Sequence, residues 1–260
     1  MEPELLGFKQ VQTKSPYEEK RYNGPATLVY YKSGKILVQG KNTEKYKEIL
    51  GLSSKNETKE EIDKVQGLII GSDETLKGDT FGGLVVAGFM ADDKVREKLS
   101  SMGVMDSKKI DDYKISLIAE KLIEQFPKNY DVISLNPLEY NQYTREEKTT
   151  VLLNKLHRQV NNALKTEKST HIVDKYPGCK AGDISLERAE SEYLEVAAAS
   201  IIARDAGLKQ LKELSVKSGM HIPKGSTHVN LALKKLKEKK LPPEEYVKLN
   251  FSNVKKVFFE

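Results

Sequence analysis

The chain has 260 residues, of which 38% are hydrophobic and 31% charged, with a net charge of +5 and a mean hydropathy of −0.55. This composition is typical of a globular protein with room for one large and one small domain, and it is too apolar for a wholly disordered chain. It excludes a membrane-spanning protein, because no apolar run approaches roughly 18 residues, and a multi-cysteine zinc site, because Cys179 is the only cysteine. The start lacks the apolar segment of a signal peptide, so we expect a cytoplasmic protein.

The N-terminal part predicts a β-hairpin and a short helix. Aromatic and β-branched residues over 26–39 flank a turn at Gly34, and a helix is expected from about Thr43 to Leu50. The polar stretch 52–66 then predicts a linker. We therefore expect a small domain over residues 1–60 and a larger one over residues 61–260.

The larger part alternates apolar strands with amphipathic helices, which predicts an α/β layer. Strands are expected over 68–72, 82–89, 130–135 and 170–174. Helices are expected over about 115–126, from a capping box at 144–147 through 164, and from about Glu187 through Leu211. The second strand is predicted to run antiparallel to the first, and the alanines of the last helix permit close approach to a sheet. The loop between Asp174 and Glu190 is short enough to leave little room for another strand.

Several catalytic motifs do not occur in the sequence. No two glycines are spaced as G-x-G, and neither a G-x-S-x-G elbow nor a Walker-type G-x-x-x-x-G-K-[ST] loop is found. The sequence therefore disfavours nucleotide-cradle and hydrolase-triad chemistry.

Carboxylates follow two of the apolar strands. Asp73 and Glu74 come after LIIGS and Asp174 after HIV, and Glu190 near the start of the alanine-rich helix is a fourth candidate. A buried charge is costly unless it meets a cation, and Mg²⁺ and Mn²⁺ prefer such oxygen ligands. The pattern favours a two-metal phosphodiesterase site for the first three acids. Taken singly, Glu190 fits a solvated first-turn residue better.

Two alternatives stay open on the residues alone. The strand-end acids could act as ordinary caps, and other acids such as Asp79, Asp106 and Asp205 compete for a place in the site. The four histidines are scattered, and each is expected to be a surface or packed residue rather than a ligand.

Seven motifs in one order resemble bacterial ribonuclease HIII, a relative of ribonuclease HII. They are GSDETLKGDTFGG (71–83), MDSKK (105–109), NPLEYN (136–141), LHRQVNNAL (156–164), IVDKYP (172–177), AESEYLEVAAASIIAR (189–204) and IPKGS (222–226). Ahead of them, the segment 15–42 resembles that family's small α+β domain, which is similar to the TATA-binding-protein fold. YKSGKILVQGK is typical of HIII rather than HII.

The resemblance implies a ribonuclease H-like mixed sheet flanked by helices. It also implies an endonuclease that cuts the RNA strand of an RNA/DNA hybrid with Mg²⁺ or Mn²⁺, leaving 5′-phosphate and 3′-hydroxyl ends. The family's four acids match Asp73, Glu74, Asp174 and Glu190. On this resemblance we expect Asp73 to bridge two ions, with the other three acids completing the shells. A monomer is the default expectation.

Substrate contacts follow from the same resemblance. They match the backbone of Thr75, Leu76, Lys77 and Gly78, together with Ser107, Lys108 and Lys224. Tyr30, Tyr31, Lys32, Lys35 and Gln39 lie on the N-terminal hairpin, where alternate residues share a face and can meet the duplex. Their other interpretation is loop structure, solvated charge and, for the tyrosines, core packing.

Basic residues cluster in two regions that suit a polyanion. Residues 20–47 and residues 217–240 each carry seven basic residues against one acid. Phosphate contacts release condensed counterions and so favour binding. On charge alone, the two clusters are better explained as solvated lysines on helix faces than as a polyanion-binding surface.

The sequence departs from the family at two places. Leu76 stands where glycine is usual, and Gly83 where proline commonly follows F-G. The first lies in the loop whose backbone amides approach the ribose 2′-hydroxyl, which separates RNA from DNA. Two other functions are therefore kept as alternatives: HII-type incision at single embedded ribonucleotides, and noncatalytic hybrid binding.

Overall fold

The computed structural model describes residues 6–40, 43–50, 65–104 and 110–260. The chain falls into two compact units, Met1–Lys64 and Val65–Glu260. The domain boundary predicted at residues 60 and 61 and the predicted linker over 52–66 lie almost wholly outside the described residues, so both stay predictions. Each unit is considered by itself.

The N-terminal unit is a four-stranded antiparallel sheet with one helix. Its strands β1 (Lys9–Val11), β2 (Glu18–Asn23), β3 (Thr27–Tyr31) and β4 (Ile36–Gln39) pair in chain order, and α1 spans Thr43–Ile49. The predicted hairpin is β3 and β4, with Leu28 opposite Val38 in the core. Phe8 meets Tyr46 of α1 edge to face at 5.4 Å between ring centroids. The predicted α+β unit and its helix are confirmed.

The larger unit is built on a five-stranded mixed sheet in the order β7-β6-β5-β8-β9. Strands β5 (Leu68–Thr75), β6 (Leu84–Ala91) and β7 (Tyr130–Leu135) are antiparallel neighbours, whereas β8 (Ser169–Asp174) and β9 (Ile184–Leu186) continue parallel to β5. Parallel pairing between β5 and β8 needs the long crossover that lies between them. The four predicted strands and the antiparallel second strand are confirmed.

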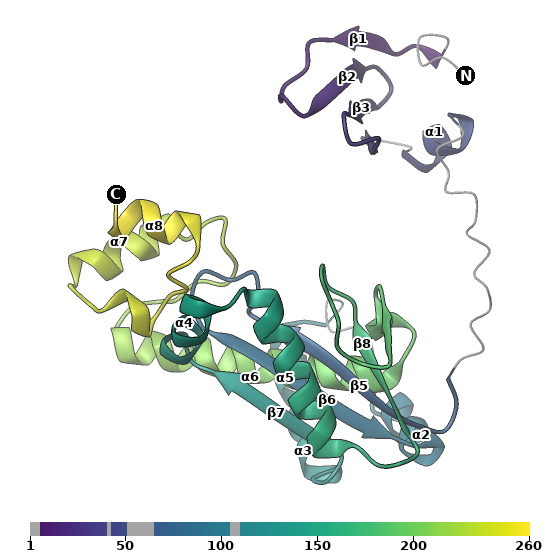
Figure 1. The fold of residues 1–260 in the computed structure, drawn as a ribbon, viewed down its shortest axis with the longest axis vertical. Helices are drawn as coiled ribbons and strands as arrows, with labels where there is room; N and C mark the ends of the chain where they lie inside the picture. Colours follow the sequence, from purple (N-terminus) through teal and green to yellow (C-terminus); the bar gives the residue numbers. More distant parts are fainter. Residues whose placement is uncertain (1–5, 41–42, 51–64, 105–109) are drawn as a thin grey trace. The chain divides into compact units, whose positions relative to one another are not determined.

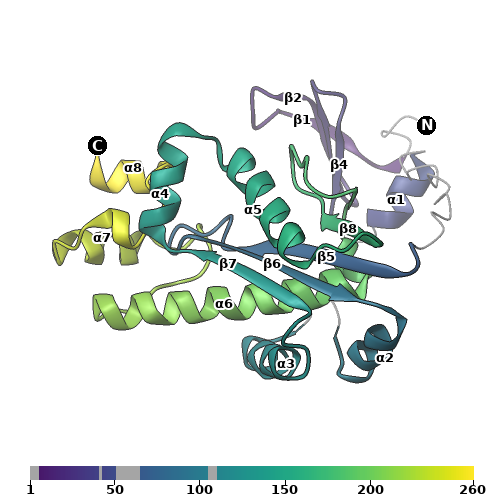
Figure 2. The same cartoon turned by 60° about the horizontal axis from the view of Figure 1, so that its bottom comes forward.

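Helices cover both faces of this sheet (Figure 2). On one face α6 (Leu194–Ser218) runs beside β5 and β6, with α2 (Asp93–Ser101) and α3 (Asp112–Gln125) near it; on the other, α5 (Thr149–Leu164) packs on β6 and β7. Helix α4 (Pro137–Glu146) follows β7, and α7 (Asn230–Glu238), a short 3-10 turn (Pro243–Glu245) and α8 (Ser252–Phe258) complete the C-terminal part (Figure 1). The predicted mixed sheet flanked by helices is confirmed.

Three local predictions were wrong. The capping box is Asn136 with Glu139 at the start of α4, and α5 begins at Thr149 without a side-chain cap. Pro137 in the first turn and the Asn136 side chain, which accepts from the Glu139 N–H, fix the start of α4. The loop before Glu190 does hold an extra strand, β9, because three residues suffice to extend the edge beside β8. The alanine-rich helix begins at Leu194, preceded by a 3-10 turn over Ala189–Ser191.

Among the described residues, no helix has the length and apolarity needed to cross a membrane.

Candidate active site

Neighbouring residues of β5 point to opposite faces of the sheet, because side chains alternate along a strand. Gly71 and Asp73 face α6: a Cβ atom on Gly71 would lie 2.2 Å from the backbone nitrogen of Val196. Ser72 and Glu74 face α5, since both contact His157 of that helix. Strand β5 extends to Thr75, so Asp73 and Glu74 lie inside the strand, and the prediction that they follow it was wrong.

Three carboxylates meet on the α6 side. Asp73, Asp174 and Glu190 each offer an oxygen, and these atoms all lie within 4.8 Å of one another. The parallel register, with Ser72 opposite Val173, brings the ends of β5 and β8 together. The Ala189 N–H donates to Asp174 Oδ1 at 2.8 Å and so ties the turn that carries Glu190 to β8.

The electrostatics of this three-acid cluster favour a bound cation. Burial, then the charge of Glu74 and those of Asp174 and Glu190, raise the pKa of Asp73 well above its usual range, against a hydrogen bond from Ser200. Asp73 and Glu190 are buried and Asp174 is half-buried. An all-oxygen donor set whose own repulsion disfavours the charged form is suited to Mg²⁺ or Mn²⁺. The cluster therefore fits the predicted metals.

Glu74 has different partners and lies outside that cluster. Its Oε1 accepts a hydrogen bond from Lys77 Nζ at 2.5 Å, and its Oε2 lies 3.3 Å from His157 Nε2. Burial opposes ionisation, but the hydrogen bond from His157, followed by the charge and hydrogen bond of Lys77, lowers the pKa of Glu74. Lys77 also lies over the Tyr176 ring, 5.0 Å from its centroid. Glu74 is thus held as a carboxylate by the protein itself.

The predicted substrate loop borders an open acidic pocket beside the cluster. The residues lining this pocket are Asp73, Glu74, Thr75, Leu76, Lys77, Gly78, Asp79, Asp174, Ser200 and Arg204. Thr75 to Gly78 were singled out from the sequence; Ser200 and Arg204 were not. The acidic pocket therefore brings the predicted loop and three of the four predicted acids to one surface.

Leu76, the departure from glycine, adopts φ of 63°, in the left-handed region. That conformation costs a non-glycine residue roughly 1–2 kcal/mol. Its side chain is buried over Gly82 and Gly207, where an added Cβ would lie 2.9 Å and 3.3 Å from Leu76 atoms. The leucine thus keeps the backbone shape of a glycine, and its burial offsets the cost.

Gly83, the second departure, donates its N–H to Gln210 Oε1 at 2.7 Å. A proline has no N–H to donate. Glycine in place of proline therefore allows a hydrogen bond from the loop to α6 that a proline could not donate.

The C-terminal segment braces the same loop. Lys248 is fully buried, and its Nζ donates to the carbonyl oxygens of Asp79 at 2.7 Å and Gly82 at 3.0 Å. Burial lowers the pKa of Lys248 to about 7. Its backbone N–H also donates to Thr80 O at 3.0 Å. A segment far along the chain thus fixes three carbonyls of the loop.

Lys224 shares an acid with Arg204 of the acidic pocket. Asp112 accepts from Arg204 Nη2 at 2.7 Å through Oδ1 and from Lys224 Nζ through Oδ2. Gly225 N–H donates to Asp79 Oδ1 at 2.5 Å, which joins the Lys224 loop to the substrate loop. The predicted Lys224 thus lies in a two-cation group with Arg204. Ser107 and Lys108 fall outside the described residues.

The hairpin residues predicted to meet a duplex are accessible on the N-terminal unit. Lys32, Lys35 and Gln39 are exposed and Tyr31 is half-buried. Since Gln39 pairs with Thr27, Tyr31 and Gln39 lie on one face of the sheet, opposite Leu28. Tyr30 packs instead against Tyr22, with ring centroids 5.9 Å apart. Contact of these residues with nucleic acid stays a prediction.

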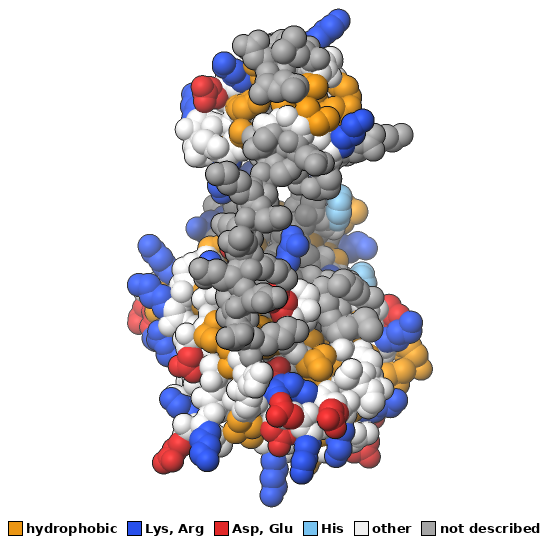
Figure 3. All heavy atoms as spheres, turned by 90° about the vertical axis from the view of Figure 1, so that its right-hand side faces the viewer, with side chains coloured by type: hydrophobic (Ala, Val, Ile, Leu, Met, Phe, Trp, Pro, Cys, Tyr) orange, Lys and Arg blue, Asp and Glu red, His pale blue; other side chains and the backbone are white. Residues whose placement is uncertain are grey.

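On the face of the larger unit seen in Figure 3, the charged side chains do not single out a binding surface. There, lysine and arginine side chains are spread among acidic ones.

Sequence reasoning underestimated His157 and missed Ser72, Arg204 and Asp112 as parts of the site. His157 is a packed histidine, as expected, but it also contacts Glu74. A signal was present: His157 follows Leu153 by four residues and precedes Val160 by three, which places it on the buried face of α5. Asp112 had no comparable signal, because its partners come from distant segments.

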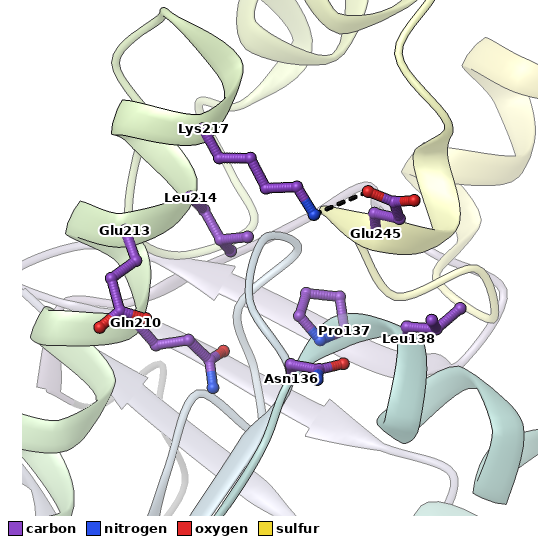
Figure 4. Close-up of a pocket in the computed structure, with 8 residues that line it drawn as sticks. All are labelled: Asn136, Pro137, Leu138, Gln210, Glu213, Leu214, Lys217 and Glu245. Atoms are coloured by element: carbon purple, nitrogen blue, oxygen red, sulfur yellow. Dashed lines mark hydrogen bonds and ion pairs between the residues drawn. The ribbon is translucent and has the colours of Figure 1, made fainter.

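A second hollow lies between the start of α4 and the end of α6 (Figure 4). Lys217 and Glu245 face each other across it and form an ion pair of 2.7 Å. Apolar carbon from Pro137, Leu138 and Leu214 lines much of the remainder. Lys217, the one cation among the described residues that line this hollow, is paired with Glu245, so the chemistry is better placed in the acidic pocket.

Comparison with known proteins identifies relatives over most of the chain. A family model described as Ribonuclease HII matches residues 70–254. The chain is 33% identical to Ribonuclease HIII of Aquifex aeolicus, over 95% of this chain and 91% of that protein, and 36% identical to Ribonuclease HIII of Streptococcus pneumoniae, over 82% and 78%. A crystal structure of Bst-RNase HIII in complex with Mn²⁺ superposes with a TM-score of 0.66 at 29% identity, covering 96% of this chain and 91% of that one.

Proposed function

The chain belongs to the ribonuclease HII/HIII family and is a ribonuclease H, and from this premise we propose that it cuts the RNA strand of RNA/DNA hybrids internally by two-metal hydrolysis. The expected products carry 5′-phosphate and 3′-hydroxyl ends. The observation that carries the proposal is the three-acid cluster of Asp73, Asp174 and Glu190, which borders the acidic pocket.

Two bound Mg²⁺ or Mn²⁺ ions would supply an activated water and stabilise the leaving 3′ oxygen. Asp73, Asp174 and Glu190 would hold one ion, and Asp73 with Glu74 would share the other. Three of these acids lie on the paired strands β5 and β8, and the Ala189 N–H ties the turn that carries Glu190 to Asp174, so their oxygens are held in place before the substrate arrives. Pre-organisation of this kind lowers the reorganisation needed at the transition state.

The chain's other residues would bind and orient the hybrid. Thr75 to Gly78 present backbone to the acidic pocket, and the left-handed Leu76 preserves the shape that a glycine would give. Arg204 and Lys224 offer cations for a phosphate flanking the scissile bond. In the N-terminal unit, Tyr31, Lys32, Lys35 and Gln39 would also contact the duplex.

A second candidate is HII-type incision at a single embedded ribonucleotide. Leu76 supports this second candidate, because the residue replaces glycine in the loop expected to approach the 2′-hydroxyl.

The test is cleavage of an end-labelled RNA/DNA hybrid by wild type and Asp174→Asn, each with Mg²⁺, Mn²⁺ or chelator. Internal RNA cuts that need metal and vanish in the variant support the proposal. Tight hybrid binding without cleavage in either metal would instead indicate a noncatalytic binding protein. A duplex with one ribonucleotide, tested in parallel, separates HIII-type from HII-type activity.

A further inference from the structure

A buried chain of polar groups leads from the interior of the sheet to Glu74. His171 Nε2 on β8 lies 2.7 Å from Ser72 Oγ on β5, and Ser72 Oγ lies 2.8 Å from His157 Nδ1 on α5. His157 Nε2 then lies 3.3 Å from Glu74 Oε2. Ser72 and His157 are 0% exposed and His171 is 1% exposed. These contacts lie in the protein interior, where an unmatched donor or acceptor is costly.

Each of the three hydrogen bonds needs one proton, and the protons that each group can carry determine which group donates in each bond. A serine hydroxyl carries one proton, so it can donate to only one of the two imidazoles and must accept from the other. Glu74, paired with Lys77 at 2.5 Å, is a carboxylate and only accepts. The nitrogen of His157 that faces Glu74, Nε2, therefore carries a proton. If His157 is neutral, its Nδ1 carries no proton and accepts a hydrogen bond from the Ser72 hydroxyl, and Ser72 in turn accepts from Nε2–H of His171.

This arrangement supplies one proton to each contact without adding a charge to the core. Burial lowers the pKa of His171 to about 4, which keeps that ring neutral near pH 7. The His157 ring is also fixed by packing: it stacks on Tyr176 with centroids 5.3 Å apart. One carboxylate oxygen of Glu74 is thus held by His157, the last of these buried polar groups, and the other by Lys77.

We propose that His157, and through Ser72 also His171, are positioning residues that orient the Glu74 carboxylate by a relay of three hydrogen bonds, His171 to Ser72 to His157 to Glu74. The catalytic consequence rests on the proposed function, but the relay itself does not. Groups behind a metal-binding carboxylate fix its orientation, and their loss typically costs about 10- to 100-fold in metal affinity or activity.

The first test is the tautomer of each imidazole in the metal-free wild type, read from long-range ¹H–¹⁵N correlation spectra near pH 7. The chain has four histidines, and two of them, His221 and His228, are exposed. Their signals are identified by disappearance in His221→Gln and His228→Gln and serve as solvent-exposed references. Both remaining rings are expected to carry a proton on Nε2. A proton on Nδ1 of either ring would overturn the relay.

The second test is a matched pair at the far end of the relay. His171→Gln places an amide N–H₂ near the position of Nε2 and keeps a donor to Ser72, whereas His171→Leu removes it. We expect His171→Leu to lower kcat for hybrid cleavage about 10-fold or more, with KM nearly unchanged, and to weaken Mn²⁺ binding measured by calorimetry without substrate. His171→Gln is expected to restore most of both.

The two tests separate failure of the relay from failure of the proposed function. Equal kcat and Mn²⁺ affinity in two folded His171 variants would overturn the positioning role, with folding checked by thermal unfolding. If wild type does not cleave the hybrid at all, the tautomers and the Mn²⁺ affinities still decide the relay.

Discussion

Asp73 and Glu74 are adjacent in the sequence, but their surroundings shift their pKa values in opposite directions. Asp73 faces α6 and lies among carboxylates, so burial and repulsion raise its pKa. Glu74 faces α5 and lies between His157 and Lys77, which lower its pKa against burial. Strand alternation alone separates the two environments.

The difference separates two ways of keeping a buried carboxylate. On the α6 side the protein gathers carboxylates that repel one another, a repulsion that a metal ion would offset. On the α5 side it supplies the partners itself, so the acid is oriented before any ion binds. The predictions below test this contrast.

The largest expected contrast is in metal binding. Asp73→Asn is expected to lower hybrid cleavage by at least about 100-fold and to weaken Mn²⁺ binding, because it removes the central acid of the three-acid cluster. Glu74→Gln is expected to lower cleavage as well, but to weaken Mn²⁺ binding less in calorimetry, since the three-acid cluster stays complete. Equal loss of Mn²⁺ binding in both variants would contradict the separation.

The close approach of α6 is expected to dominate stability on the Asp73 side. In Gly71→Ala the new methyl would lie 2.2 Å from the Val196 backbone nitrogen, so the helix has to move. We expect a loss of about 3 kcal/mol in the free energy of unfolding, measured in urea. Gly78→Ala is the control, because no atom of the described residues lies within 4 Å of its added methyl, and it is expected to change stability by about 0.5 kcal/mol or less.

The pH dependence of stability without metal is expected to have opposite signs at the two acids. The raised pKa of Asp73 means that the folded state gains stability as pH falls through that raised value toward 3.8. Wild type is therefore expected to gain on Asp73→Asn as pH is lowered. The lowered pKa of Glu74 means that its contribution is present above 4.5 and is lost as pH falls below it, so wild type loses its advantage over Glu74→Gln. Urea unfolding from pH 7 to pH 3 measures both, and parallel curves would refute the contrast.

The smallest effect is expected at the surface, where Asp112 links Arg204 and Lys224. Because the Asp112 side chain is 39% exposed, Asp112→Asn is expected to change the free energy of unfolding by about 1 kcal/mol or less. Release of two cations should tighten hybrid binding a few-fold and steepen its dependence on salt. Binding titrations at two salt concentrations check this; weaker binding would indicate that Asp112 positions the cations instead.

Much of the fold was predictable from local patterns. Strands β7 and β8 and the amphipathic helices α3 and α5 repeat the periods expected from their residues, and the glycine turn marked the N-terminal hairpin. Elements without a strong period were missed or misplaced, among them the short edge strand β9 and the start of α5. Three residues at a sheet edge are stabilised by the neighbouring strand rather than by their own pattern.

The candidate site divides in the same way. The sequence by itself determined that Asp73, Glu74 and Asp174 lie near the ends of apolar strands, and its motifs related Glu190 to them. Only the tertiary structure decided that Glu190 joins Asp73 and Asp174 while Glu74 turns toward His157. It also decided that Ser72 connects two histidines 85 and 99 residues farther along the chain. The physical reason is that alternation separates the faces of a strand, but the pairing of distant strands and the helix packed on each face determine which groups meet there.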